Sequence, residues 1–215
     1  MQITTVGLDL AKHIFQVHAV DETGKVVVRK RLRRTEVVSF FASVPPCLIG
    51  MEACTISHHW ARELTQLGHT VKLMPPAYVK AYVKRGKTDA ADAEAICEAV
   101  VRPSMRFVPV KSAEQQSVLM LHRVRALLIR QRTMLINALR GHLAEFGIIV
   151  AQGISRIREL IKLMTDESPD AGLPPLARRA LAPLVDQLLD LQPRIRALEA
   201  ELLAWHRQSQ ESRRL

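Results

Sequence analysis

Four acidic residues stand where metal-dependent chemistry on phosphate esters would need them: Asp9, Glu52, Asp89 and Asp92. Phosphodiester cleavage with two metal ions needs several carboxylates that converge from different elements, with the ions roughly 3.5–4 Å apart. Mg²⁺ prefers hard oxygen ligands and keeps some of its waters, so three or four carboxylates are enough. This set of residues therefore favours a site for Mg²⁺ or Mn²⁺.

Asp9 and Glu52 are acids in or directly after apolar segments. Asp9 interrupts the run Val6–Leu10, and Glu52 follows Ile49–Met51. A carboxylate among apolar neighbours is costly unless it meets a cation or a water-filled cleft. Either acid alone is explained as well by a strand end that faces solvent. Together they favour a site, because the first and fourth strands of a ribonuclease-H sheet are neighbours.

Asp89 and Asp92 lie three residues apart in a predicted helix, so both carboxylates share one face. The alanines around them leave room for close approach. The ordinary alternative is the enrichment of acids at helix N-termini, which the helix dipole favours. Glu94 and Glu98 are interpreted as solvated acids of the same helix.

The elements that must position these acids follow from hydrophobic patterning. Strands are expected at 3–10, 14–20, 26–32, 47–51 and 71–74, and helices at 36–44, 57–67, 77–84 and 89–101. An antiparallel meander followed by alternating helix and strand is the ribonuclease-H order. We therefore expect an α/β domain over residues 1–108, a ribonuclease-H/RuvC-like mixed sheet flanked by helices.

Residues 109–215 are predicted to be all helical. The pattern gives one long helix at 112–146, a short one at 154–164 and a polar loop at 165–175. Steps of three and four then separate Leu181, Leu184, Leu188, Leu191, Ile195, Leu198, Leu202 and Trp205, the spacing of a coiled-coil seam. Pro183 suits the first turn of that helix. Pro193 should kink or divide it.

The charge balance points to a polyanionic partner. The chain has 31 Lys and Arg against 21 Asp and Glu, a formal charge of +10. Nucleic acid or an acidic membrane surface would fit such a charge. No apolar stretch is long enough to span a membrane, and the N-terminus lacks a signal-peptide layout. We therefore expect an intracellular protein that binds nucleic acid.

Basic residues are clustered along the chain. One cluster lies along the third strand and at its two ends, and it consists of Lys25, Arg29, Lys30, Arg31, Arg33 and Arg34. On the long helix no acid appears between Glu114 and Glu145, which favours phosphate contact over a merely solvated basic face. The residues predicted to contact nucleic acid are Lys12, Lys80, Lys84, Arg85, Lys87, Arg123, Arg125, Arg130 and Arg132.

Cysteine and histidine suggest no further site. Cys47, Cys54 and Cys97 are too few and too scattered for a zinc knuckle or a disulfide framework, so we expect reduced, structural cysteines. The eight histidines show no metal-ligand spacing. His58 and His59 are interpreted as a pair at the start of a helix.

Three short motifs carry a resemblance to a known family. They are Gly7-Leu8-Asp9-Leu10-Ala11-Lys12, Gly50-Met51-Glu52-Ala53 and Lys87-Thr88-Asp89-Ala90-Ala91-Asp92-Ala93. The combination resembles the transposases of the insertion sequence 110 family, including its 1111 subgroup. The resemblance runs from Gly7 to about Phe146 and implies an Asp-Glu-Asp-Asp tetrad, Asp9, Glu52, Asp89 and Asp92, that binds Mg²⁺ or Mn²⁺ in a RuvC-like domain.

The resemblance also implies partners and a place of action. In this family a noncoding bridge RNA pairs with target and donor DNA. We expect DNA, a bridge or guide RNA and further copies of the chain (a dimer or tetramer) as partners, and no membrane. The place of action would be the bacterial cytoplasm, at the nucleoid.

The family continues through a helical region into a C-terminal domain that supplies a serine nucleophile. No segment of this chain resembles that serine domain, and the chain ends soon after its leucine seam. The expectation is an N-terminal portion of a transposase or recombinase that does not complete strand exchange by itself.

Three other functions are compatible with parts of the same pattern. A stand-alone RuvC-like junction resolvase or nuclease would use the same four acids. A non-catalytic module for nucleic-acid binding and oligomerisation would need none of them. A sugar-kinase-like fold shares the strand order, but no glycine-rich phosphate loop follows Gly7–Ala11, and the charge of +10 argues against it.

Overall fold

The computed structural model describes residues 2–83, 88–153, 156–165 and 172–209. Lys84, Arg85 and Lys87, three of the predicted nucleic-acid contacts, lie outside these ranges. The chain divides into two compact units, Met1–Gln115 and Gln116–Leu215.

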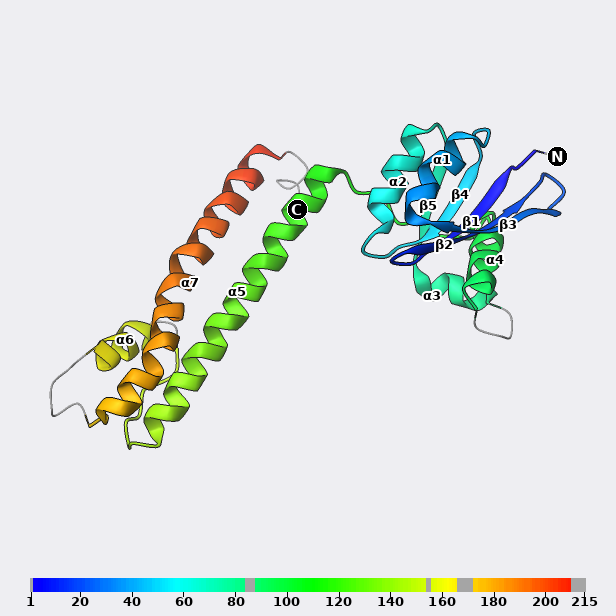
Figure 1. Ribbon diagram of the computed structural model, residues 1–215. Helices are drawn as coiled ribbons and strands as arrows, with labels where there is room; N and C mark the ends of the chain where they lie inside the picture. Colours follow the sequence, from blue (N-terminus) through cyan, green and yellow to red (C-terminus); the bar gives the residue numbers. More distant parts are fainter. Residues whose placement is uncertain (1, 84–87, 154–155, 166–171, 210–215) are drawn as a thin grey trace. The chain divides into compact units, whose positions relative to one another are not determined.

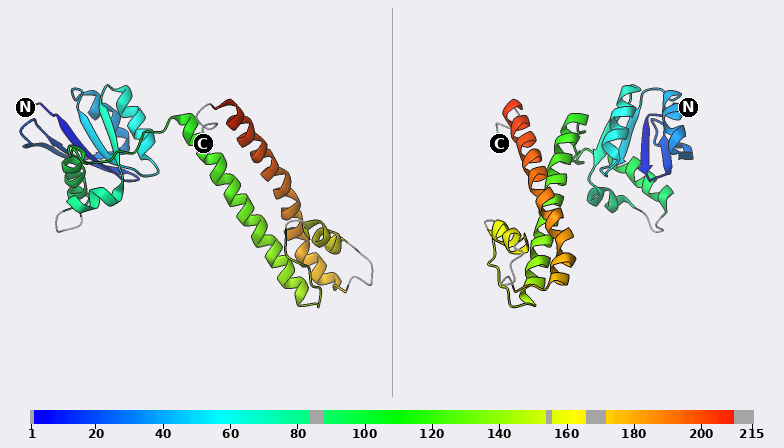
Figure 2. Two further views of the ribbon diagram at one scale, coloured as in Figure 1. Left: turned by 180° about the vertical axis from the view of Figure 1, so that it is seen from behind. Right: turned by 60° about the vertical axis from the view of Figure 1, so that its left-hand side comes forward.

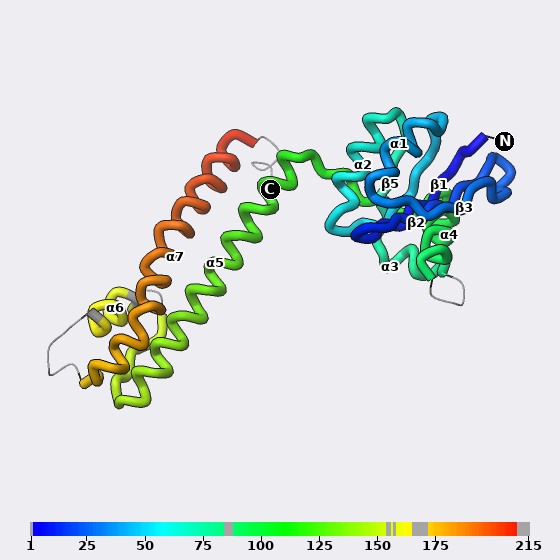
Figure 3. Tube along the Cα trace, in the orientation of Figure 1, coloured from blue at the N-terminus to red at the C-terminus, as the bar shows by residue number. Residues whose placement is uncertain are grey.

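The first unit is built on a five-stranded mixed sheet (Figures 1 and 3). Its strands are β1 (Thr5–Leu10), β2 (Ile14–Val20), β3 (Val26–Arg33), β4 (Leu48–Glu52) and β5 (Thr70–Met74). Their order across the sheet is β3-β2-β1-β4-β5. The first three form an antiparallel meander, and β4 and β5 run parallel to β1. The predicted α/β class, with β1 and β4 as neighbours, is confirmed.

Helices cover both faces of this sheet (Figure 1). A 3-10 turn η1 (Arg34–Glu36), α1 (Val37–Ala42) and α2 (Ser57–Gln66) lie on one face. On the other lie α3 (Pro76–Val79), the 3-10 turn η2 (Lys80–Tyr82) and α4 (Asp89–Val100). The side chains of β1 alternate between the faces. Val6 and Leu8 are fully buried in the core with Phe41 and Trp60, which leaves Gly7 and Asp9 facing α4.

The second unit is helical. Its helices are α5 (Ala113–Ala144), α6 (Ile157–Thr165) and α7 (Pro175–Gln208). The long helices α5 and α7 run antiparallel and side by side (Figures 1 and 2). At one end Leu139 of α5 shares a buried cluster with Leu160 and Leu181, and towards the other end Arg125 donates to Glu199 at 3.0 Å. Among the described residues no helix is long and apolar enough to cross a membrane.

The leucine seam of α7 is a packing surface in this unit. Leu181, Leu188, Leu191 and Ile195 are buried, whereas the positions from Leu198 to Trp205 are only half-buried. The seam therefore closes most tightly near the α6 end of the helix pair. The supercoiling that would make it a coiled coil stays a prediction.

The expectation for Pro183 needs correction, and so does the expectation that Pro193 divides the helix. Helix α7 begins at Pro175, so Pro183 lies well inside the helix rather than in its first turn. Pro193 does not divide the helix, which continues to Gln208. Proline removes the hydrogen bond to the carbonyl four residues earlier, here that of Leu189. Both Pro193 and Leu189 are exposed, so water can solvate that carbonyl.

Candidate metal centre

The candidate site begins with two glycines under helix α4. Gly7 of β1 and Gly50 of β4 are cross-strand partners in the parallel register. A Cβ on Gly7 would lie 2.5 Å from the amide nitrogen of Cys97, and one on Gly50 would lie 2.7 Å from the Cβ of Val100. The absence of both side chains lets α4 rest directly on the backbones of β1 and β4.

Two acids extend from the same strands towards α4. Asp9 follows Gly7 by two residues and Glu52 follows Gly50 by two residues, so both acids face the side of the sheet that α4 covers. The paired register of β1 and β4 extends through Leu8 and Met51, and the two acids come next at the carboxyl ends of these strands. Both acids are half-buried.

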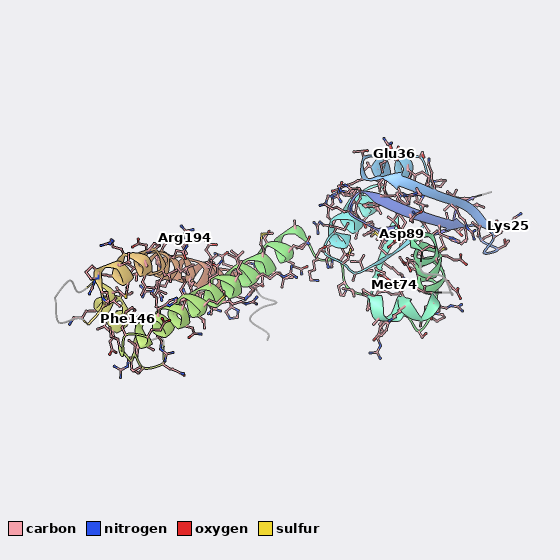
Figure 4. All side chains as sticks on the ribbon, turned by 60° about the horizontal axis from the view of Figure 1, so that its bottom comes forward. Lys25, Glu36, Met74, Asp89, Phe146 and Arg194 are labelled. Carbon is pink, nitrogen blue, oxygen red and sulfur yellow. The ribbon has the colours of Figure 1, made fainter. Side chains whose placement is uncertain are left out.

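The N-terminus of α4 brings the other two acids to this edge. Thr88 caps the helix, and its hydroxyl accepts a hydrogen bond of 3.3 Å from the amide of Ala91. The cap fixes Asp89 and Asp92 in the first turn, and Figure 4 shows Asp89 at this end of α4. Ligand oxygens of Asp9, Asp89 and Asp92 all lie within 4.8 Å of one another.

Burial and mutual repulsion raise the pKa values of two acids at this site, Asp9 and Glu52. Burial, followed by the charges of Asp92 and Asp89, raises the pKa of Asp9 to about 6, against a smaller opposing effect of the Leu10 amide. Burial and the charges of Asp9 and Asp92 also raise the pKa of Glu52. Glu52 is not among the three acids that meet within 4.8 Å, but it lies near enough for the charges of Asp9 and Asp92 to raise its pKa.

The donor set fits a divalent cation. Within the part of the chain that the structure describes, no Lys or Arg forms an ion pair with any of the four acids. Carboxylate oxygens that converge without a cation repel one another, and Mg²⁺ and Mn²⁺ accept such hard oxygen ligands. The cluster therefore has the ligand chemistry that a divalent ion requires.

The predicted nucleic-acid contacts lie in different settings. Lys12 and Lys80 of the first unit are exposed. Arg123 and Arg130, on the part of α5 in the second unit, are exposed as well. Arg125 is engaged with Glu199 of α7, so its charge is already compensated. The Nε atom of Arg132 is buried and has no hydrogen-bond partner among the described residues.

Two features of the structure were not predicted from the sequence: the packing role of two glycines and the separation of the basic residues of β3. Gly7 and Gly50 stood in the motifs, but their role depends on where α4 packs. The odd-numbered arginines of β3 (Arg29, Arg31 and Arg33) were grouped with Lys30 and Arg34. The two-residue periodicity of a strand could have separated them.

Comparison with known proteins shows the family of the chain. The DEDD family of insertion sequence 110, described as a transposase family, matches residues 6–148. The chain belongs to this family. It is 52% identical to a probable family 20 transposase of Pseudomonas aeruginosa over 205 residues, which cover 95% of this chain and 60% of that protein.

Two further relatives carry related names. A putative transposase of Sinorhizobium fredii is 48% identical over all of this chain and 54% of its own length. The transposase for insertion sequence element IS1111A of Coxiella burnetii is 40% identical over 99% of this chain and 58% of its own length. The chain thus spans between about half and three fifths of the length of these relatives.

Proposed function

We propose that this member of the insertion sequence 110 transposase family contributes the metal-dependent part of DNA strand cleavage and transfer. Asp9, Glu52, Asp89 and Asp92 would hold Mg²⁺ or Mn²⁺. The observation that supports this proposal best is the convergence of Asp9, Asp89 and Asp92 within 4.8 Å, from a strand and from the first turn of a helix far away in the sequence.

The chain's own residues have separate tasks in this proposal. Asp9 and Glu52 present carboxylates from adjacent strands, which limits their movement relative to each other. Asp89 and Asp92 complete the ligand set from the capped end of α4. A divalent ion bound there would neutralise the carboxylates and polarise the reacting phosphate ester. Asp9 must release the proton that it holds below about pH 6 before it can serve as a ligand.

DNA is the proposed substrate, and a bridge RNA is a proposed partner. The formal charge of +10 supports phosphate binding. Exposed basic side chains at Lys12, Lys80, Arg123 and Arg130 would contact the backbone of these nucleic acids. The relatives are named as transposases, which supports DNA as the substrate.

Thermal unfolding with and without Mn²⁺ tests the metal ligands. An ion that binds only the folded state stabilises it by about 2.7 kcal/mol at a hundredfold excess over its Kd. We expect Mn²⁺ to raise the Tm of the wild type, and to have much less effect on Asp9→Asn and Asp92→Asn. Glu98→Gln is the control, because Glu98 lies on the same helix but pairs with Arg102 at 2.6 Å. Equal Mn²⁺ effects on all four proteins would reject the ligand assignment.

A strand-cleavage assay tests the reaction itself. The full chain is incubated with Mg²⁺, the candidate bridge RNA and matching donor and target duplexes. Cleaved or joined product that requires Asp9 supports the proposal. Product of equal yield in Asp9→Asn contradicts the role of the carboxylates in the reaction.

A further inference from the structure

The face of the sheet that carries Asp9 also carries a basic row. Asp9 pairs across the sheet with Gln16 of β2, and Gln16 pairs with Arg31 of β3. In paired positions of an antiparallel sheet, side chains point to the same face. Arg31 therefore faces the same side as Asp9, two strands away. Neighbouring strands are about 4.8 Å apart, which puts the two Cα atoms roughly 10 Å from each other.

Alternation along β3 divides its basic residues between two faces. Arg29, Arg31 and Arg33 share the face of Asp9, and we call these three residues the arginine row. Lys30 points to the other face, where its ammonium lies 5.4 Å from the centre of the Phe40 ring of α1. The single basic cluster of the sequence is therefore two surfaces, and only one of them faces the side of the acids.

A groove lies between the arginine row and the first turn of α4. It has a volume of about 260 Å³, and its lining includes Gln16, Arg29, Arg31 and Ala90, together with Lys30, whose ammonium lies over the Phe40 ring on the other face. Ala90 follows Asp89 directly in the first turn of α4, so one end of the groove lies beside the candidate metal ligands. Arg29 forms an ion pair with Glu94 of α4 at 3.7 Å, which links the row to the helix that carries Asp89 and Asp92.

Arg31 has the properties of a phosphate contact. Its side chain is exposed, and within the described residues no carboxylate pairs with it. A guanidinium presents a planar set of donors that matches two phosphate oxygens at once. Arg33 stands two residues away on the same face and adds positive potential there, whereas the charge of Arg29 is partly compensated by Glu94.

We propose that the arginine row binds the phosphodiester backbone next to the reacting phosphate, with Arg31 as the main contact. This inference rests on the proposed function, since it assumes that a nucleic-acid strand lies over the carboxylates. The strand would run from the acidic cluster along the groove beside Ala90 towards β3. The proposed occupant is the DNA strand that is cut, because that strand alone must place a phosphate on the acids.

The main alternative is protection of a sheet edge. Strand β3 is the outermost strand, and charged side chains on edge strands prevent pairing with other chains. Lys30 would serve that purpose as well as Arg31 does. Substitutions at these two neighbouring residues therefore separate the two explanations, since they remove the same charge from opposite faces.

The test measures binding of fluorescein-labelled DNA and RNA duplexes of one sequence to the full chain, in EDTA, over a series of salt concentrations. Loss of one phosphate contact lowers the slope of log K against log salt by about 0.9. We expect Arg31→Gln to show this loss on DNA, with affinity about five- to tenfold weaker at low salt. Lys30→Gln should stay within about twofold of the wild type, because its charge lies on the other face.

Other results would contradict the inference in distinguishable ways. If the wild type binds DNA and Arg31→Gln behaves like Lys30→Gln, the arginine row is not a subsite, while the proposed function stands. A loss confined to the RNA duplex overturns the assignment to the DNA strand. If the wild type binds neither duplex, both proposals fail. Arg31→Lys guards against misfolding, since it keeps the charge and should retain the wild-type slope with weaker binding.

Discussion

Gly7 of β1 lies beside Gly50 of β4, and neither position has room for a Cβ under helix α4. The helix therefore approaches the sheet to the distance of backbone contact. This approach brings Asp89 and Asp92 to the strands that carry Asp9, so the geometry of the acids depends on two residues without side chains.

The first prediction concerns Gly7→Ala. The added methyl would collide with the carbonyl oxygen of Ala93 and the amide nitrogen of Cys97, and backbone atoms cannot rotate away. Helix α4 must shift, at an expected cost of about 3 kcal/mol or more in the free energy of unfolding. Urea unfolding measures this cost. Because the shift also moves Asp89 and Asp92, the stabilisation by Mn²⁺ should be lost.

Gly141→Ala is the matched control for this substitution. Gly141 lies inside α5, and apart from its chain neighbours and the backbone of its own helix no described atom lies within 4 Å of the position that its Cβ would take. Alanine is a better helix former than glycine, so we expect stabilisation of about 0.5–1 kcal/mol. If Gly7→Ala is as mild as Gly141→Ala, helix α4 does not rest on β1 as described.

Much of the fold could be predicted because it is encoded locally. The strand expected at 14–20 is found at Ile14–Val20, and the helix expected at 89–101 ends one residue earlier, at Val100. The helix expected at 77–84 was wrong in extent. The α-helix ends at Val79 and a 3-10 turn follows to Tyr82, after which Val83 is extended. Local pattern does not encode such a change, because it depends on packing against α4.

The candidate site was only partly visible in the sequence. Asp9 attracts attention because a carboxylate interrupts an apolar strand. The ion pair of Arg125 with Glu199 could not be expected, since the two residues are 74 positions apart and meet only when α7 folds back on α5. The two-residue alternation of a strand separates Arg31 from Lys30, but only the register of β3 with β2 shows that Arg31 is the one on the face of Asp9.

The second prediction concerns pH and Asp9 without metal. The pKa of Asp9 is about 6 in the folded state, above the ordinary value of 3.8, so the folded state binds more protons between these values. The free energy of unfolding therefore falls as pH rises through this window. Asp9→Asn removes the effect and should be more stable than the wild type at neutral pH in EDTA, by on the order of 1 kcal/mol after allowance for solvent screening.

Thermal melts of both proteins in EDTA across this pH range measure the difference. The gap between Asp9→Asn and the wild type should open as pH rises from about 4 to about 7. A wild type that is the more stable protein at neutral pH in EDTA would show that the carboxylates do not repel one another as the structure implies. Added Mn²⁺ should reverse the order of stability.

The third prediction concerns His58, which is buried on α2. Its Nδ1 accepts a hydrogen bond of 3.2 Å from the amide of Lys111, just before α5 begins. Burial, followed by the charges of Lys111 and Arg62, lowers the pKa of His58. Just below pH 6.5 the unfolded state therefore binds more protons than the folded state. The free energy of unfolding falls as pH drops through about 6.5.

The variant His58→Gln should lose about 1–2 kcal/mol at neutral pH, because the amide of Lys111 loses its acceptor. Its stability should also change less than that of the wild type on acidification. His59→Gln is the control, since His59 is exposed on the same turn, where it makes a weak pair with Glu63 at 3.8 Å and an edge contact with the ring of Trp60. Similar losses in the two variants would mean that the contact with Lys111 adds nothing to stability.

The last prediction concerns assembly through α5. Met120, Leu127 and Met134 recur every seven residues and are 64%, 49% and 64% exposed, and Val124 between them is also exposed. Apolar side chains at this spacing form one stripe along a helix, and an exposed apolar stripe favours association. We expect this stripe to join copies of the chain. Leu127→Glu should lower the mass measured by light scattering. The Tm should stay nearly unchanged, because the side chain of Leu127 is already half exposed.

The control is a leucine on the inside of the same helix pair. Leu188 of α7 is fully buried in the cluster that includes Leu139 and Leu181. Leu188→Ala should cost about 2–5 kcal/mol and lower the Tm. The two variants thus separate a packing surface from an association surface. If Leu127→Glu keeps the mass of an oligomeric wild type, the copies meet elsewhere. If the wild type is monomeric at every concentration tested, the exposed stripe does not join copies of this chain.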